Sequence, residues 1–277
     1  MRNREGQQEP PDAGTNRALR RTALWAALLC VAACCACDTK VKSAVATDAG
    51  GLPRFHRAAR VGDVDAVRQM LKEGVSPDLR DVDGVTALHR AARDGKLDVA
   101  QALLDANANT NLTTATGWTP LQLAVKYNRK ESVELLLRYN ADMDTRTPDG
   151  FQPLTAAIKS GNDEIARLLI ADWPTWTLDR IEKDDKTVEY ETRTTGTHSA
   201  NVNVKDGEGI TPLWAAVAAN NYGIIGELLD KNADINEKVL EGRTVLHLAA
   251  ERCPEYTVKL LLDRNAIGNA GLTDAGI

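Results

Sequence analysis

Aromatic residues are scarce in this chain of 277 residues, in which Phe, Trp and Tyr together make up 4%. Hydrophobic residues nevertheless reach 43%, so an apolar interior must consist mainly of Ala, Leu, Val and Ile. Small and aliphatic side chains of this kind suit closely packed helices. The length allows one large domain or two ordinary ones, because domains usually run to about 100–200 residues.

An excess of basic residues is also absent. The chain has 34 Lys and Arg against 39 Asp and Glu, which gives a formal net charge of −5. Proteins that bind nucleic acids need clustered Lys and Arg to replace the counterions of the phosphates. No basic patch stands out beyond the N-terminal segment, and we therefore expect no nucleic-acid partner.

Motifs that carry catalysis or hold cofactors are missing as well. The sequence contains no Gly-rich phosphate loop, no H-E-x-x-H and no G-x-S-x-G. The carboxylates fall mostly in loops, where a solvated face would place them. We expect a protein that is not an enzyme and that takes no cofactor, no metal and no small-molecule substrate.

The first 37 residues differ from the rest of the chain. Residues 1–21 are polar and end with Arg17, Arg20 and Arg21, and the sixteen residues 22–37 are almost wholly apolar. A positively charged segment followed by a short apolar run and small residues is typical of a secretory signal peptide. The apolar run is shorter than the ~20 residues of a transmembrane helix. An uncleaved anchor is the second interpretation, and a core helix of the mature fold is the third.

One template recurs along the remainder of the chain, as G-V-T-A-L-H-R-A-A at Gly84 and G-W-T-P-L-Q-L-A-V at Gly117. The leading glycines are 33 residues apart, except that the interval from Gly150 to Gly209 is 26 residues longer. A degenerate copy begins at Gly51. The spacing predicts six units, at 51–83, 84–116, 117–149, 150–208, 209–241 and 242–275.

The template resembles the ankyrin repeat, whose G-x-T-P-L-H-x-A-A signature and 33-residue period are both present. The resemblance covers Gly51 to about Ala275. It implies an all-α solenoid of helix–turn–helix units with finger loops, in which neighbouring units share one core. Thr and Pro at the start of the first helix, such as Thr119 and Pro120, cap the backbone and set the first turn.

The four histidines add no catalytic signal. Three of them, His56, His89 and His247, occupy the slot where the ankyrin family uses the imidazole to hydrogen-bond the adjoining finger loop. His198 stands apart, and we expect neither a catalytic nor a ligand role for it.

Two sharp turns are expected in each unit, at positions where a residue that tolerates positive φ is favoured. Between the helices these are Gly62, Gly95, Asn128, Gly161, Asn220 and, as an outlier before a proline, Cys253. After the second helix they are Gly74, Asn107, Asn140, Ser199, Asn232 and Asn265.

The fourth unit carries 26 extra residues at about 172–197. Thr187–Arg193 alternates apolar and charged residues, which is typical of a strand, and Thr194–Thr197 reads T-T-G-T, a plausible turn. We predict a small β-hairpin that projects from the solenoid. The alternative is an irregular surface loop.

Ankyrin proteins typically recognise other proteins, so the resemblance implies a protein partner bound through finger tips and the concave face of the inner helices. Specificity then falls on the positions that the template leaves free. Trp118, Tyr127 and Phe151 lie in adjacent units and could form one patch, because exposed aromatics flanked by charge are typical of interface hot spots. The alternative is that Trp118 and Phe151 pack within their own fingers. The predicted partner-binding residues are Val85, Arg93, Asp94, Trp118, Lys126, Tyr127, Phe151, Lys159, Ile210, Arg243, Glu251 and Arg252.

The last predicted unit is followed by the start of a seventh finger, T-D-A-G-I, which stops at Ile277. We expect either a truncated product or a partner at that end. This leaves a second function class open, in which the repeats are the recognition module of a larger protein with an enzymatic or toxin-like C-terminal part.

Four of the five cysteines precede the repeats, so no disulfide can staple the solenoid. The C-C-x-C spacing of Cys34, Cys35 and Cys37 crowds metal ligands, which argues against a zinc site. Val31–Cys34, V-A-A-C, resembles the bacterial lipobox. It predicts a signal peptide at 1–33, a lipid on Cys34 and a tether at 34–50, and hence an exported protein anchored to the membrane, facing the periplasm or the cell exterior. Ordinary cleavage after Ala33 without a lipid is the alternative.

Overall fold

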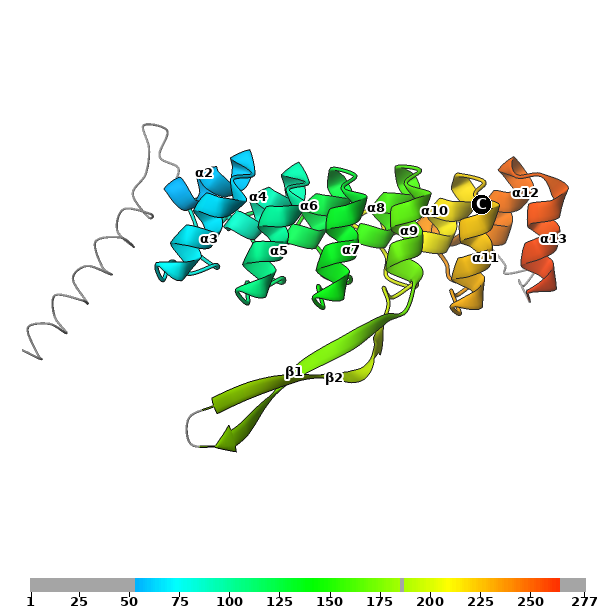
Figure 1. Cartoon of the computed structure of the whole chain (residues 1–277). Coiled ribbons are helices and arrows are strands. Elements are labelled where there is room, and N and C mark those ends of the chain that lie inside the picture. The colour runs from blue at the N-terminus through cyan, green and yellow to red at the C-terminus, as the bar shows by residue number, and fades with distance from the viewer. Residues whose placement is uncertain (1–52, 185–186, 265–277) are drawn as a thin grey trace, which may run out of the picture.

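The structure is a computed structural model that describes residues 53–184 and 187–264. Within these residues, pairs of short helices stand side by side in a row, and a two-stranded ribbon projects from it (Figure 1). The inner helices are α2 (Arg54–Val61), α4 (Ala87–Asp94), α6 (Pro120–Lys126), α8 (Pro153–Lys159), α10 (Pro212–Ala218) and α12 (Val245–Arg252). The outer helices are α3 (Val64–Lys72), α5 (Leu97–Asp105), α7 (Lys130–Arg138), α9 (Asp163–Ile170), α11 (Tyr222–Asp230) and α13 (Glu255–Asp263). A 3₁₀ turn, η1 (Leu240–Gly242), precedes α12.

The inner helices begin where the sequence predicts. Thr86, Thr119 and Thr211 are N-caps, and each hydroxyl oxygen accepts a hydrogen bond from the backbone N–H three residues further on. This hydrogen bond satisfies one of the backbone N–H groups that have no acceptor within the first turn of a helix. Pro120 is the first helical residue of α6, where its lack of an N–H costs nothing.

The sharp turns follow the predicted glycines and asparagines. Every Gly and Asn predicted between the two helices of a pair has positive φ, for example 53° at Asn128. Cys253 is different, because it is extended with φ −105°, and Pro254 then caps the next helix. At the turn after the second helix of a pair, Asn107, Asn140 and Asn232 have positive φ. Ser199 directly follows the hairpin and does not have positive φ, so the prediction of such a turn there was wrong. Asn265 lies outside the described residues.

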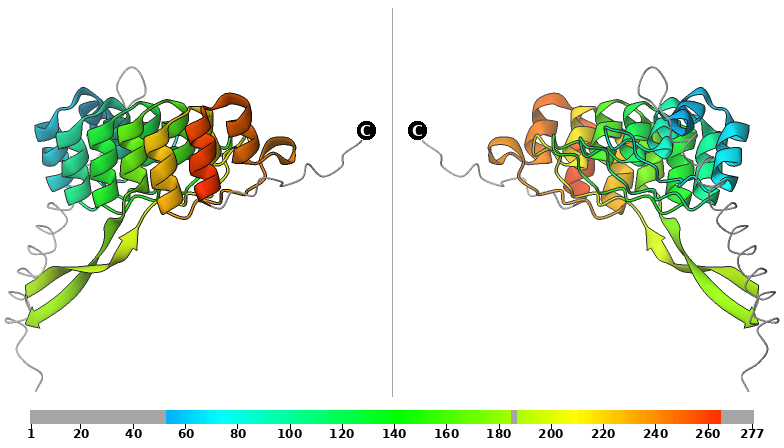
Figure 2. Two further views of the ribbon diagram at one scale, coloured as in Figure 1. Left: turned by 90° about the vertical axis from the view of Figure 1, so that its right-hand side faces the viewer. Right: turned by 90° about the vertical axis from the view of Figure 1, so that its left-hand side faces the viewer.

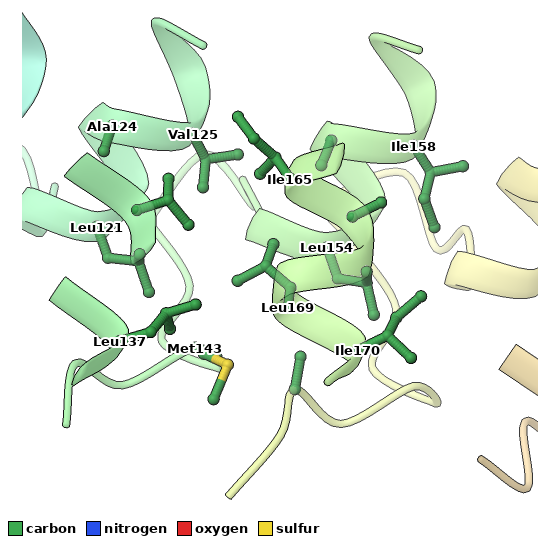
Figure 3. Packing of buried hydrophobic residues seen from close by; sticks show 14 of the residues in the cluster. Leu121, Ala124, Val125, Leu137, Met143, Leu154, Ile158, Ile165, Leu169 and Ile170 are labelled. Carbon is green, nitrogen blue, oxygen red and sulfur yellow. The ribbon is translucent and has the colours of Figure 1, made fainter. Parts of the chain in front are cut away.

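The core runs continuously through the row. Each inner helix packs on the next inner helix, and each outer helix on its own inner partner. Leu121, Leu137, Leu154 and Leu169 are fully buried and interdigitate between neighbouring pairs (Figure 3). Ala124 leaves room for this close approach and is itself fully buried. The scarcity of aromatic residues is thus matched by an aliphatic interior.

The insertion is a β-hairpin, as predicted. β1 (Trp173–Asp184) pairs antiparallel with β2 (Thr187–His198), and the pair extends away from the helices in all views (Figures 1 and 2). At its base the indole Nε1 of Trp173 donates to the carbonyl oxygen of Leu168, 2.7 Å away.

The turn predicted at Thr194–Thr197 was wrong. Thr194 pairs with Trp176 and Gly196 with Thr175, so this stretch belongs to β2 and lies near the base of the hairpin. The register shifts there, between Thr175 and Trp176 on the facing strand. Glycine inside a strand often marks such a bulge, and this is the physical reason that a turn-like sequence occurs within a strand.

Candidate protein-binding surface

Inner helices are tied to the neighbouring finger by buried side chains. His56 Nε2 lies 2.9 Å from the carbonyl oxygen of Leu79, and His89 Nε2 lies 3.0 Å from that of Trp118. Gln122 takes the same position in the next repeat and donates from Nε2 to Thr145 O at 2.6 Å. Three of the finger loops are therefore held by a fixed donor, as predicted for His56 and His89. For His247, the finger that it was predicted to reach lies outside the described residues.

Burial governs the charge of His89. It lowers the pKa of the imidazole from 6.5 to about 4, although hydrogen bonds to the carbonyls of Trp118 and Leu112 oppose the shift. A neutral imidazole with its polar atoms engaged in the fold holds the finger and has no free proton to transfer at neutral pH.

Two predicted aromatic residues meet across adjacent fingers. The ring centroids of Trp118 and Phe151 are 4.8 Å apart, at an interplanar angle of 50°. Lys126 Nζ lies over the indole, 4.1 Å from its centroid. Both rings are half-buried, and Tyr127 is 47% exposed. The two rings thus pack against each other across neighbouring fingers.

A hollow of about 400 Å³ adjoins this contact. Four of the predicted residues line it, namely Val85, Arg93, Trp118 and Tyr127. We call these four residues together with Lys126 and Phe151 the aromatic surface. It spans the second, third and fourth repeats and combines aromatic rings with two cationic side chains.

Leu123 also lines this hollow and was missed by the sequence analysis. It lies in α6 four residues before Tyr127, so both face the same side of the helix. That spacing was the available signal, because the residue occupies a position that the repeat template leaves free.

Charged residues at the ends of α4 and α6 are largely engaged with the protein itself. Arg93 Nε donates to Asp94 Oδ1 at 2.8 Å. Arg129 Nε donates to the carbonyl oxygen of Arg93 at 3.1 Å, which links the two repeats. The structure therefore places Asp94 as the ion-pair partner of Arg93, beside the aromatic surface.

A second hollow, of about 340 Å³, lies at the next junction along the row. Phe151 and Lys159, both predicted, line it together with residues of the following finger. Lys159 Nζ donates to Asp206 Oδ2 at 2.7 Å and to Glu208 Oε2 at 3.0 Å. Although burial opposes it, these bonds raise the pKa of Lys159, so the ammonium stays charged.

The remaining predicted residues lie apart from the aromatic surface. Ile210 is half-buried and packs against the core. Arg243 and Glu251 form an ion pair in the last described repeat, where Arg252 is exposed. That repeat stands at the other end of the row from α4 (Figure 1). Cys34 lies outside the described residues.

Among the residues that the structure describes, no helix is both long enough and apolar enough to span a membrane. No group of three or more His, Cys, Asp or Glu side chains there could hold a metal ion.

Comparison with known proteins gives matches along most of the chain. The family model for ankyrin repeats (3 copies) matches residues 55–147, 106–179 and 182–271. Among curated proteins, neurogenic locus notch homolog protein 1 of Xenopus laevis is 41% identical over 73 residues, which is 26% of this chain and 3% of that protein. A putative ankyrin repeat protein of fowlpox virus is 42% identical over 50 residues, 18% of this chain and 12% of that protein. The matches thus span only a small part of those proteins.

Solved structures show the same fold. The ankyrin repeat domain of Bcl-3 aligns with a TM-score of 0.63 and 24% identity, covering 79% of this chain and 86% of that one. The human ASB11 ankyrin repeat domain aligns with a TM-score of 0.53 and 25% identity, covering 77% of this chain and 84% of that one. With the repeat pattern, the capped helices and the tied fingers, these matches establish that the chain belongs to the ankyrin repeat family.

Proposed function

We propose that this protein is a non-enzymatic scaffold that binds another protein through the aromatic surface. Ankyrin repeat domains are generally protein–protein interaction modules. The observation that carries the proposal is the contact between Trp118 and Phe151 beside a hollow lined by the exposed Tyr127. Aromatic rings and arginine beside a concave, partly dry surface are the usual anchors of an interface.

The histidine chemistry favours binding over catalysis. The burial that lowers the pKa of His89 to about 4 keeps the imidazole neutral, and its hydrogen bonds serve the fold. The residues of the aromatic surface supply hydrophobic area, a guanidinium and an ammonium, which suit recognition of a protein surface.

A photo-crosslinking experiment tests this proposal. A photoreactive phenylalanine analogue at Tyr127, introduced in the native cell, is expected to capture a discrete partner. The same analogue at Tyr256, which is 52% exposed in the last described repeat, is the matched control. Capture by Trp118→Ala/Phe151→Ala that is as strong as in the parent, with helical circular dichroism preserved, would overturn the proposal.

We further propose that the scaffold is exported and held at the cell envelope by a lipid on Cys34. The support is the lipobox-like V-A-A-C after a basic and apolar leader, and residues 34–50 are long enough to form a tether. Replacing Cys34 by Ser should move the protein from the membrane fraction to the soluble exported fraction. Continued processing and membrane retention of this variant would instead favour cleavage without lipidation at Cys34 and another means of attachment.

A second candidate function is the recognition module of a larger protein whose further part has an enzymatic or toxin-like activity. The observation that favours it is an apolar hollow of about 300 Å³ in the last described repeat, lined in part by Leu246, Val258 and the 48% exposed Leu262. A further repeat would cover such a face. Reading the gene beyond the codon for Ile277 tests this candidate.

A further inference from the structure

The junction between the fourth and fifth repeats departs from the pattern of the others. In the third repeat Thr119 caps α6 and Gln122 reaches the next finger. In the fourth repeat the two residue types are exchanged, so that Gln152 caps α8 and Thr155 takes the bridging position. Thr155 is fully buried, and its side chain is too short to reach the next finger as a glutamine does.

The cap fixes how the amide of Gln152 is oriented. The backbone N–H of Thr155 donates to Oε1 at 2.6 Å. Because a backbone N–H can only donate, the oxygen must face it, and the NH₂ group must point the other way. Gln152 is only 1% exposed, and its Nε2 has no hydrogen-bond partner among the residues that the structure describes.

A buried amide donor without a partner is uncommon in folded proteins. Within the described part of the chain, Thr155 Oγ1 is also buried and unpartnered. Two polar groups are thus unsatisfied at one junction, whereas Gln122, the glutamine of the third repeat, donates to the next finger. An acceptor from outside the repeats would satisfy the amide.

Gln152 lines the hollow of about 340 Å³ described above. Phe151 also lines it, together with three acidic residues, Asp149, Asp206 and Glu208. Lys159 neutralises only part of this charge, because a single ammonium binds two of the three carboxylates. The hollow therefore combines a buried donor, an aromatic ring and an excess of negative charge.

We propose that this hollow, the junction pocket, binds an arginine side chain of the protein partner together with a neighbouring backbone carbonyl. The carbonyl accepts from Gln152 Nε2 once the side chains that cover this buried nitrogen move aside. The guanidinium lies on Phe151 and pairs with Glu208, which is exposed and could bind a second cation beside Lys159. The inference rests on the proposed binding function and adds a chemical class of partner segment, one that carries arginine.

The test uses a small probe with both groups, N-acetyl-arginine-N-methylamide, and N-acetyl-glutamate-N-methylamide as its acidic counterpart. The full chain, labelled with ¹⁵N, is titrated with each probe while NMR follows the side-chain NH₂ signals and, in the parent chain and the variants alike, the backbone amide signal of Gly207, which lines the pocket. The Gln152 signal, identified by its loss in Gln152→Thr, is expected to shift in a saturable way with the arginine probe only. Added salt should weaken the effect, because the pairing is partly exposed.

Two variants separate binding from folding. Gln152→Thr recreates the Thr cap of α6 and removes the amide donor, so helix content should be retained while affinity for the arginine probe falls about fivefold. Glu208→Lys should lower the affinity for the arginine probe about tenfold. Glu131→Lys, the same charge change on the outer helix α7, should leave this affinity unchanged. Equal shifts with both probes, no shift with the arginine probe, or equal effects of the two charge reversals would overturn the proposal.

Failure of this inference is distinguishable from failure of the proposed function. A partner that crosslinks at Tyr127 but binds Gln152→Thr and Glu208→Lys as tightly as the parent chain refutes the junction pocket alone. Absence of any crosslinked partner, with the arginine probe still bound at Gln152, counts against the aromatic surface alone.

Discussion

The indole of Trp118 rests against the phenyl ring of Phe151, with ring centroids 4.8 Å apart, although the two residues belong to different repeats. Each residue follows the leading glycine of its own finger, so stacking of the repeats brings them together. The contact couples two neighbouring fingers and forms the middle of the aromatic surface.

This coupling should be measurable as an energy. Aromatic pairs contribute about 0.5–1.5 kcal/mol beyond the area that they bury. In a double-mutant cycle with Trp118→Ala and Phe151→Ala, we expect a coupling free energy of about 1 kcal/mol from urea denaturation. Additivity of the two single changes to within about 0.3 kcal/mol would contradict the contact.

The finger glycines offer a matched pair. At Gly150 a Cβ would come 2.2 Å from Gly207 Cα, whereas at Gly209 nothing lies within 4 Å of the added atom. Both have positive φ, 82° and 76°. Gly209→Ala should therefore cost only the backbone strain, about 1 kcal/mol, and Gly150→Ala should cost about 3 kcal/mol or more because the clash adds to it. Thermal unfolding of the two variants measures the difference, and equal midpoints would refute the close approach.

Acid should destabilise the fold through His89. Burial places the folded-state pKa at about 4, below the ordinary 6.5, so between these values the unfolded chain takes up a proton that the folded chain does not. The free energy of unfolding therefore falls as the pH drops through this window, by roughly 2–3 kcal/mol between about pH 7.5 and about pH 4.5. His89→Gln places an amide in the bridging position, as Gln122 does in the next repeat, and should reduce this loss of stability in acid. The same acid sensitivity in both proteins would show that His89 is not the group responsible.

The left-handed asparagines should be sensitive to the loss of their special conformation. Asn128 has φ 53°, so Asn128→Ala is expected to cost about 1 kcal/mol and Asn128→Gly far less. Ser160, which caps α8 at φ −83°, is the control, since alanine adopts that conformation freely. Chemical denaturation that ranks Ser160→Ala as the more damaging change would oppose this explanation.

The repeat register, the capped helix starts, most of the turns and the presence of a hairpin follow from the sequence alone. These features depend on one residue and its near neighbours. Thr119 caps because its hydroxyl meets an N–H three residues on, and Asn128 turns the chain because it tolerates positive φ. A period of 33 residues then repeats each local solution.

Features that depend on how the repeats stack required the tertiary structure. The contact of Trp118 with Phe151 and the unpaired amide of Gln152 depend on side chains from different repeats or on what a neighbour fails to supply. Thr194–Thr197 has the composition of a turn but lies within β2, because pairing with β1 continues past it to the base of the hairpin. Local chemistry determined where each repeat begins and turns, and packing between repeats decided which side chains meet.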